Sequence, residues 1–260
     1  MFKLDKSDKT LLIRDFIIIF AVILTIFLDT ESKPESAAVR DKQTVHAKQN
    51  DGSIHVVAKP ESIPVLVNKL NKLSESYNPR DLVYTEIPFI FQEKTEKRKM
   101  RAEAAAAINQ LFTDAKAQGI SLLGVSGYRS HATQTKLFNN YVRKDGYEKA
   151  RTYSALPGTS EHETGLAIDV TGEDGRCAAE DCFGGTKEAI WLEEHVAEYG
   201  FIIRYPEGKE AITGYEYEPW HLRYVGKSIA LEIMNKGITL EEYFNAEPVI
   251  ILIKGVKNIE

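Results

Sequence analysis

The sequence predicts a single domain of the α+β class. Predicted helices and strands are mixed along the chain without the regular strand–helix–strand order that produces a parallel α/β sheet. With 260 residues, of which 43% are hydrophobic, the chain is long enough to bury one sizeable core. Because the first quarter of the chain is polar apart from one apolar run, we expect the core to form from the residues that follow it.

The apolar run, FIIIFAVILTIFL at residues 16–28, predicts a signal sequence. Lys3, Lys6 and Lys9 precede it, so a basic region is followed by an apolar one. A membrane-spanning helix needs about 20 apolar residues, and this run is nearer to a signal-peptide core. No small-x-small cleavage motif follows it at once, and no cysteine is available for lipidation. These features favour an uncleaved signal anchor at residues 1–28 over a cleaved signal peptide.

The distribution of lysine and arginine predicts that the body of the protein lies outside the cytoplasm. We therefore expect a single-pass membrane protein with an extracytoplasmic domain, or a secreted protein if the signal is cleaved. Residues 29–60 are polar and mixed in charge, which predicts a flexible linker with a root-mean-square span of roughly 30 Å. His46 and His55 belong to this tract and are expected to be solvated. The folded domain is expected at residues 61–248, and residues 249–260 form a tail.

The first strong helix signal covers residues 95–118. Thr95 can cap its start, alanines fill its middle, and Gly119 follows as a stop signal. The apolar stretch ISLLGVSGYR then predicts a buried strand that ends near Gly127.

Two further helices are predicted by their end signals. Ser130 can cap a helix over residues 131–144 that Gly146 ends, and a helix over residues 187–199 stops at Gly200. Strands are predicted at residues 165–170, 201–205 and around 220–225.

Composition excludes one class of partner and leaves the cysteines open. A net charge of −5 and a pI near 5.8 predict no broad basic surface, so we do not expect nucleic-acid binding. Cys177 and Cys182 have neither zinc-ribbon spacing nor the C-x-x-C redox spacing. They either close a small-loop disulfide outside the cytoplasm or remain as two free thiols.

Four histidines are candidate metal ligands. His195 lies on an amphipathic helix and His131 in the first turn of a capped helix, so both are expected to have surface roles. His162, Asp169 and His221 are instead flanked by turn or aromatic residues. Zinc accepts imidazole nitrogen and carboxylate oxygen, and three protein ligands plus water make a catalytic site.

The spacing of His162 and Asp169 requires a turn. His162 and Glu163 begin like the H-E-x-x-H zinc helix, but Leu166 stands where the second histidine is required. Seven extended residues would place His162 and Asp169 roughly 23 Å apart, so the chain must fold back if both bind one ion. Gly165 permits that turn, and Asp169 then lies on the strand face opposite the apolar residues.

Glu218 is the candidate proton carrier. It lies three residues before His221, and in a local turn this spacing places a carboxylate beside a ligand without making it one. Such a carboxylate can take a proton from metal-activated water and pass it to a leaving amine. The alternative is a surface glutamate before a tight turn at Pro219.

Five stretches suggest a family. LVNK, SGYRSHATQ, SALPGTSEHETGLAID, the long segment from WLEEHV to LRYVG, and TLEEYF occur between about residues 65 and 244. In this order they resemble the zinc D-alanyl-D-alanine carboxypeptidases of the VanY type, relatives of the bacterial L,D-carboxypeptidases. The resemblance implies a small antiparallel sheet flanked by helices, with one Zn²⁺ per domain in a groove. It also implies that His162, Asp169 and His221 bind the metal and that Glu218 is the catalytic base.

The same resemblance implies substrate contacts. Arg129, Gln134 and Ser160 match substrate-contacting residues of the family, and Arg129 suits either the terminal carboxylate or the developing oxyanion. One departure is Glu163, where relatives often have Gln. It is expected at the rim of the site, where it alters the charge without touching the ligands.

The implied reaction is hydrolysis of the last peptide bond of peptidoglycan stem peptides, with release of D-alanine. Three alternatives remain open: an L,D-carboxypeptidase acting on tetrapeptide stems, an endopeptidase, and a non-catalytic wall-binding module with a structural zinc. An intact Glu218 disfavours the last of these. The sequence predicts no particular oligomeric state.

Overall fold

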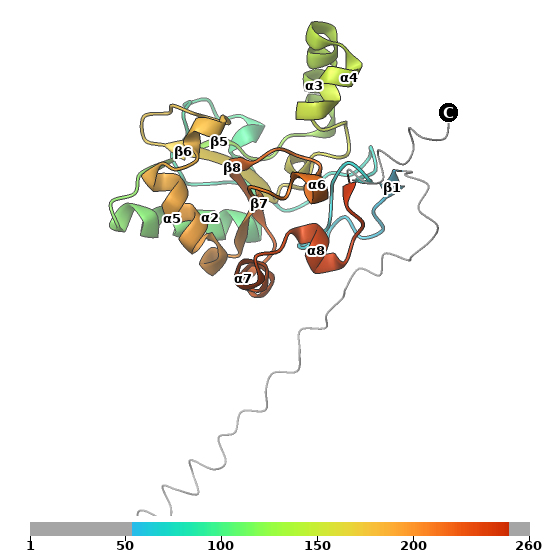
Figure 1. The fold of residues 1–260 in the computed structure, drawn as a ribbon. Coiled ribbons are helices and arrows are strands. Elements are labelled where there is room, and N and C mark those ends of the chain that lie inside the picture. Colours follow the sequence, from blue (N-terminus) through green and yellow to red (C-terminus); the bar gives the residue numbers. More distant parts are fainter. Residues whose placement is uncertain (1–53, 250–260) are drawn as a thin grey trace, which may run out of the picture. The chain divides into compact units, whose positions relative to one another are not determined.

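The computed structural model describes residues 54–249 (Figure 1). The predicted signal anchor, most of the predicted linker including His46, and the last eleven residues, 250–260, lie outside the described residues. Within residues 54–249, no helix has both the length and the hydropathy of a membrane span. The predicted α+β class is confirmed, because the described residues form small sheets, mostly antiparallel, packed with helices.

A four-stranded antiparallel sheet carries the centre of the fold. Its order is β5-β6-β8-β7, so β6 and β8 are the inner strands. They pair in a register that sets Asp169 directly opposite His221. The pairing of β7 with β8 is interrupted between Ile203 and Tyr205. The strands are β5 (Leu122–Ser126), β6 (Ala167–Gly172), β7 (Phe201–Tyr205) and β8 (Glu218–Tyr224).

The first predicted helix starts later than its pattern suggested. Helix α2 (Ala102–Ala117) covers only the alanine-rich part, and Thr95 makes no capping hydrogen bond. The preceding residues form a short 3₁₀ turn, η1 (Glu96–Arg98), and then a strand, β4 (Lys99–Arg101). That strand pairs with β3 (Leu82–Tyr84), and this long-range pairing replaces the first helical turns. The larger core cluster joins the apolar side chains of α2 to those of the central sheet.

The two later helices follow their end signals. Helix α3 (His131–Asp145) begins at Ser130, whose hydroxyl accepts the backbone N–H of Thr133 at 3.4 Å, and ends at Gly146. With α4 (Tyr147–Tyr153) it forms a hairpin that projects from the sheet (Figure 1). Residues 187–199 form α5 (Lys187–His195) and a 3₁₀ turn, η4 (Val196–Tyr199), before Gly200.

The remaining elements close the domain around the sheet. A second core cluster joins β7 to α7 (Lys227–Lys236) and α8 (Leu240–Phe244). The end of the predicted linker is part of the fold, because β1 (His55–Val56) pairs in parallel with β2 (Asn71–Lys72) and leaves His55 exposed. Short helices are η2 (Glu161–Thr164), η3 (Asp181–Phe183) and α6 (Glu210–Thr213).

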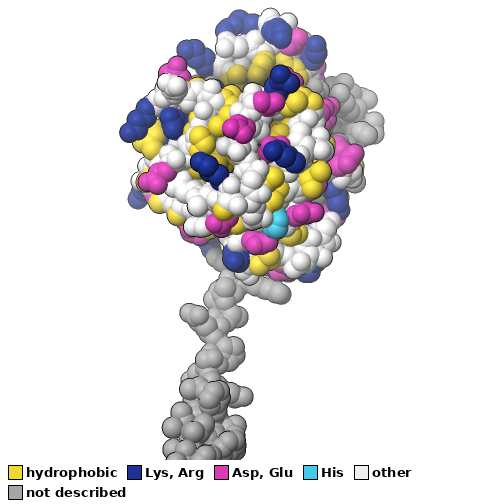
Figure 2. Space-filling view, turned by 90° about the vertical axis from the view of Figure 1, so that its left-hand side faces the viewer, with side chains coloured by type: hydrophobic (Ala, Val, Ile, Leu, Met, Phe, Trp, Pro, Cys, Tyr) yellow, Lys and Arg dark blue, Asp and Glu magenta, His cyan; other side chains and the backbone are white. Residues whose placement is uncertain are grey.

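The surface charge, the cysteines and His195 were each the subject of a sequence prediction. Positive and negative side chains are interspersed on the face shown in Figure 2. Cys177 and Cys182 form a disulfide with a Cα–Cα distance of 5.4 Å. It ties the loop after β6 to η3. His195 is partly exposed, and its Nδ1 lies 3.0 Å from the carboxylate of Glu198.

Candidate active site

A tight turn brings His162 and Asp169 together. His162 lies in η2, which ends at Gly165 with φ of 70° in the left-handed region, and β6 starts two residues later. The turn is closely packed, because a Cβ atom at position 165 would lie 2.8 Å from the side chain of Leu82. The chain thus folds back as expected, and His162 Nε2 lies 3.3 Å from Asp169 Oδ2.

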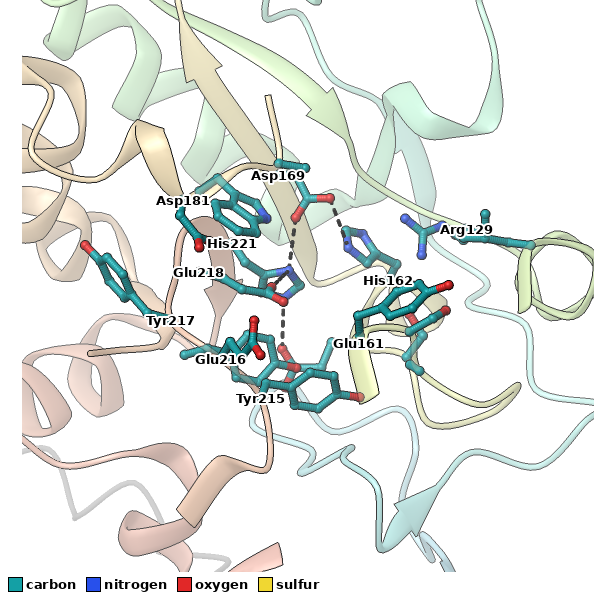
Figure 3. Close-up of a pocket in the computed structure, with 18 of the residues that line it drawn as sticks. Arg129, Glu161, His162, Asp169, Asp181, Tyr215, Glu216, Tyr217, Glu218 and His221 are labelled. Atoms are coloured by element: carbon teal, nitrogen blue, oxygen red, sulfur yellow. Dashed lines mark hydrogen bonds and ion pairs between the residues drawn. The ribbon is translucent and has the colours of Figure 1, made fainter. Parts of the chain in front are cut away.

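His221 reaches the same point from β8. Because it is the cross-strand neighbour of Asp169, its Nδ1 lies 3.0 Å from Asp169 Oδ1 (Figure 3). The rings of His162 and His221 are nearly perpendicular, with centroids 5.0 Å apart. Asp169 therefore stands between two imidazoles and presents one oxygen to each.

The three side chains fit a zinc ion. One donor atom from each of His162, Asp169 and His221 lies within 4.8 Å of the others, and all three residues are buried. Two imidazole nitrogens and a carboxylate oxygen are donors that zinc accepts, and three protein ligands leave a position open. His162 Nδ1 donates to the carbonyl of Gly127 at 2.8 Å, which leaves Nε2 free to bind a metal.

The two histidines of the cluster have opposite pKa shifts. Burial lowers the pKa of His162. Burial acts in the same direction at His221, but hydrogen bonds to Asp169 and Glu161 outweigh it and raise the pKa of this imidazole to about 10. The neighbouring carboxylates therefore stabilise positive charge at His221, whereas burial favours the neutral form of His162.

Glu218 lies beside this cluster at the start of β8. Its Oε2 is 3.8 Å from His221 Nδ1. The expected local turn is instead a strand, and the interrupted pairing between β7 and β8 lets residues three apart meet on one side. Burial raises the pKa of Glu218 to about 7, and the nearby Asp169 carboxylate acts in the same direction. Its carboxyl group can therefore gain and lose a proton near neutral pH.

A cavity of about 380 Å³ opens over the cluster (Figure 3). The disulfide loop contributes Ala179 and Asp181 to one wall, and the α3–α4 hairpin contributes Tyr141 and Tyr153 to another. The cavity is thus an aromatic pocket with the His–Asp cluster at its base. Its other aromatic lining residues are Tyr205, Tyr215, Tyr217 and Trp220.

The three predicted substrate contacts occupy different places. Arg129 and Ser160 line the cavity, whereas Gln134 does not and is only 1% exposed. Gln134 accepts a hydrogen bond from Arg129 Nη1 at 2.9 Å and donates to the carbonyl of Ala155 at 2.7 Å. Ser126 accepts a second bond from Arg129 at 3.3 Å. Gln134 therefore supports Arg129 from behind the cavity.

The expectation that Glu163 lies at the rim is wrong. Glu163 is 4% exposed, because the loop before η2 folds over it and the backbone N–H of Gly158 donates to its Oε1 at 2.8 Å. Its Oε2 lies 2.8 Å from His131 Nδ1, so His131 also has a partner rather than a plain surface position. The pair joins η2 to the start of α3.

Sequence reasoning missed Glu161 and Tyr205. Glu161 is 2% exposed, and its Oε2 lies 3.4 Å from His221 Nε2, whereas the Tyr205 ring packs against the His221 ring at 5.0 Å. One signal could have found Glu161. Arg204 and Arg223 stand in the apolar stretches FIIRY and WHLRY, and a buried arginine requires an acidic partner.

The sequence of this chain is similar to those of known carboxypeptidases. The VanY family profile, described as D-alanyl-D-alanine carboxypeptidase, matches residues 97–227. The putative carboxypeptidase YodJ of Bacillus subtilis (strain 168) is 47% identical over 197 residues, which cover 76% of this chain and 72% of the relative.

Two solved structures share the fold. The LdcB LD-carboxypeptidase is 46% identical with a TM-score of 0.72, over 75% of this chain and 91% of that one. The vancomycin resistance D,D-pentapeptidase VanY, solved as a mutant in complex with Zn(II), is 32% identical with a TM-score of 0.56, over 70% of this chain and 99% of that one.

Proposed function

Because the chain belongs to the VanY family of D-alanyl-D-alanine carboxypeptidases, we propose that this carboxypeptidase uses zinc to remove the C-terminal D-alanine from peptidoglycan stem peptides. The observation that carries the proposal is the buried donor set of His162, Asp169 and His221, within 4.8 Å of one another at the base of a cavity that Glu218 also lines. Zn(II) in the related VanY structure supports the choice of metal.

Glu218 is the proposed proton carrier. When bound by the three ligands, zinc supplies a Lewis acid that polarises the scissile carbonyl and acidifies the attacking water. The Glu218 carboxylate takes the proton from that water and delivers it to the nitrogen of the departing D-alanine. A pKa of about 7 suits both transfers, because the carboxyl group can then act as base and as acid in one cycle.

Arg129 is the proposed anchor for the substrate carboxylate. Among the described residues that line the cavity, it is the only lysine or arginine. Its hydrogen bonds to Gln134 and Ser126 hold the guanidinium in place, so its remaining donors can face a carboxylate with little loss of entropy. A carboxypeptidase requires such a group, since it must distinguish a chain end from an internal peptide bond.

An L,D-carboxypeptidase acting on tetrapeptide stems is the second candidate. The similarity to the LdcB LD-carboxypeptidase supports it, with 46% identity and a TM-score of 0.72 against 32% and 0.56 for the D,D-pentapeptidase VanY. Both reactions use the same ligands and base. They differ in the configuration of the residue that contributes the scissile carbonyl.

Digestion of defined stem peptides tests the proposal. The zinc-loaded protein is incubated with tri-, tetra- and pentapeptide stems, and the products are weighed by mass spectrometry. D,D-specificity converts pentapeptide to tetrapeptide, whereas L,D-specificity converts tetrapeptide to tripeptide. Cleavage within a stem would indicate an endopeptidase, and intact stems in all three digests would contradict peptidase activity.

We also propose that the domain works on the outer face of the cytoplasmic membrane, held by residues 1–28. The apolar run with its basic flank supports the anchor. The Cys177–Cys182 disulfide supports an oxidising compartment, since structural disulfides are rare in the cytoplasm.

A further inference from the structure

Glu161 divides its two carboxylate oxygens between different partners. Oε1 accepts hydrogen bonds from Arg204 Nε at 2.7 Å and from Arg223 Nη1 at 2.6 Å. Oε2 instead faces the site, 3.4 Å from His221 Nε2 (Figure 3). The side chains of Glu161, Arg204 and Arg223 are all fully buried. Bulk water therefore does not compete for either oxygen.

The two arginines fix the position of this carboxylate. The guanidinium groups of Arg204 and Arg223 place positive charge within hydrogen-bonding distance of the negative carboxylate, and all three side chains are fully buried. Arg223 is itself tied to the carbonyl of Val65 at 2.6 Å, and Arg204 is paired with Glu241 at 2.6 Å. Glu161 is thus an acceptor held in a fixed position.

The two histidines of the cluster have matching arrangements. Each directs one ring nitrogen at Asp169: His162 Nε2 at 3.3 Å and His221 Nδ1 at 3.0 Å. The other ring nitrogen of each histidine faces a fixed acceptor. For His162 this acceptor is the Gly127 carbonyl, and for His221 it is the Glu161 carboxylate. An acceptor at the distal nitrogen sets the tautomer and the orientation of a metal-binding imidazole.

We propose that Glu161 is a positioning residue for the metal centre: its Oε2 accepts the Nε2–H of His221 and so holds the ring with Nδ1 aimed at the ion. This inference rests on the proposed zinc site and adds a role for a residue that is not itself a ligand. It also explains why two arginines are buried beside the site, because they hold the carboxylate that orients His221.

Glu161→Gln tests the role through zinc affinity. The amide of glutamine has one acceptor oxygen instead of two. Because Arg204 and Arg223 both donate to that oxygen, the NH₂ group is turned towards the Nε2–H of His221, where it cannot accept a hydrogen bond. The zinc Kd, measured by competition with a chromophoric chelator, should rise about 10 to 100-fold, as is typical when such a partner of a ligand is lost. The visible spectrum of the Co²⁺-substituted variant should change as well, because the orientation of His221 is altered.

Glu241→Gln is the matched control. Glu241 is fully buried in the same charge network and accepts from Arg204 and from Asn68, but within residues 54–249 it forms no hydrogen bond or ion pair with His221. The control loses the same charge and should destabilise the domain similarly, yet its zinc Kd should equal that of the wild type. Equal zinc affinities in Glu161→Gln and wild type, or equal losses in both variants, would overturn the proposal.

An NMR measurement on the wild-type protein tests the same role without relying on a variant that has to fold. Long-range ¹⁵N–¹H spectra of the zinc-loaded protein report the state of each histidine ring. They should show His221 protonated at Nε2 with a strongly hydrogen-bonded proton, and ligation of zinc through Nε2 would contradict the inference. Neither measurement uses a peptide substrate. A protein that binds zinc but cleaves no stem would therefore contradict the proposed function, while the Kd comparison still decides the role of Glu161.

Discussion

At the scale of single residues, the proposed metal ligands are distinct from the proposed proton carrier. His162, Asp169 and His221 converge on one point, whereas Glu218 stands 3.8 Å from His221 with its pKa raised to about 7. Family resemblance predicted these four residues. It did not predict that Gln134 lies behind Arg129 or that Glu163 is buried, because both facts depend on how distant loops fold over these side chains.

Replacing Glu218 should separate catalysis from metal binding. Glu218→Gln keeps the size of the side chain but cannot accept a proton, so hydrolysis of the stem peptide should fall by about 10² to 10⁴-fold. Zinc content, measured by atomic emission, should match the wild type. Glu207→Gln, at an exposed position, is the control and should retain full activity. A zinc-free Glu218→Gln protein would instead make Glu218 a ligand.

Replacing His162 should have the opposite effect on metal. His162→Ala removes one of three proposed ligands, so zinc occupancy after dialysis should drop sharply while the apo protein stays folded by circular dichroism. His195→Ala removes a partly exposed histidine that contacts Glu198 and the ring of Trp191, away from the proposed ligands, and should keep its zinc. Full zinc content in the first variant would contradict the ligand assignment.

At the scale of elements, local signals predicted helix ends well and failed where a distant strand intervened. Ser130 and Gly146 bound α3 as predicted, because a cap and a glycine act on their own helix. The helix expected from Thr95 begins at Ala102 instead, since residues 99–101 pair with β3. The buried carboxylate of Glu161 was missed for the same reason, as its partners lie 43 and 62 residues further along the chain.

The turn between η2 and β6 gives an element-scale prediction. Gly165→Ala should lower both the free energy of unfolding and the zinc affinity, because position 165 combines a φ of 70° with a Cβ site 2.8 Å from Leu82. Gly119→Ala is the control: it has a φ of 80° but nothing within 4 Å, so it should cost about 1–2 kcal/mol of backbone strain and no zinc affinity. Urea titration and chelator competition measure the two effects. Equal losses in both variants would show that the packing around Gly165 is unimportant.

At the scale of the whole molecule, the proposed anchor determines where the active site works. Protease added to intact cells stripped of their wall should release a fragment close in size to residues 60–260, because the linker expected before the domain lies outside the membrane. A cytoplasmic marker protein should survive the same treatment. If the domain is protected until the cells are lysed, the anchor proposal is wrong.

The hydrogen bond between Asn68 and Glu241 joins an early and a late part of the domain. The amide of Asn68 donates to Glu241, 173 residues further along the chain, and Glu241 in turn pairs with Arg204 beside the metal cluster. Until residue 241 joins the fold, Arg204 would be buried without this partner, at a cost of about 3–5 kcal/mol. If the proposed anchor exports the domain with residue 68 ahead of residue 241, the domain would therefore reach full stability only after α8 has crossed the membrane. On that route the chain would cross the membrane before its fold is complete, and the active site would first assemble outside, beside the proposed peptidoglycan substrate.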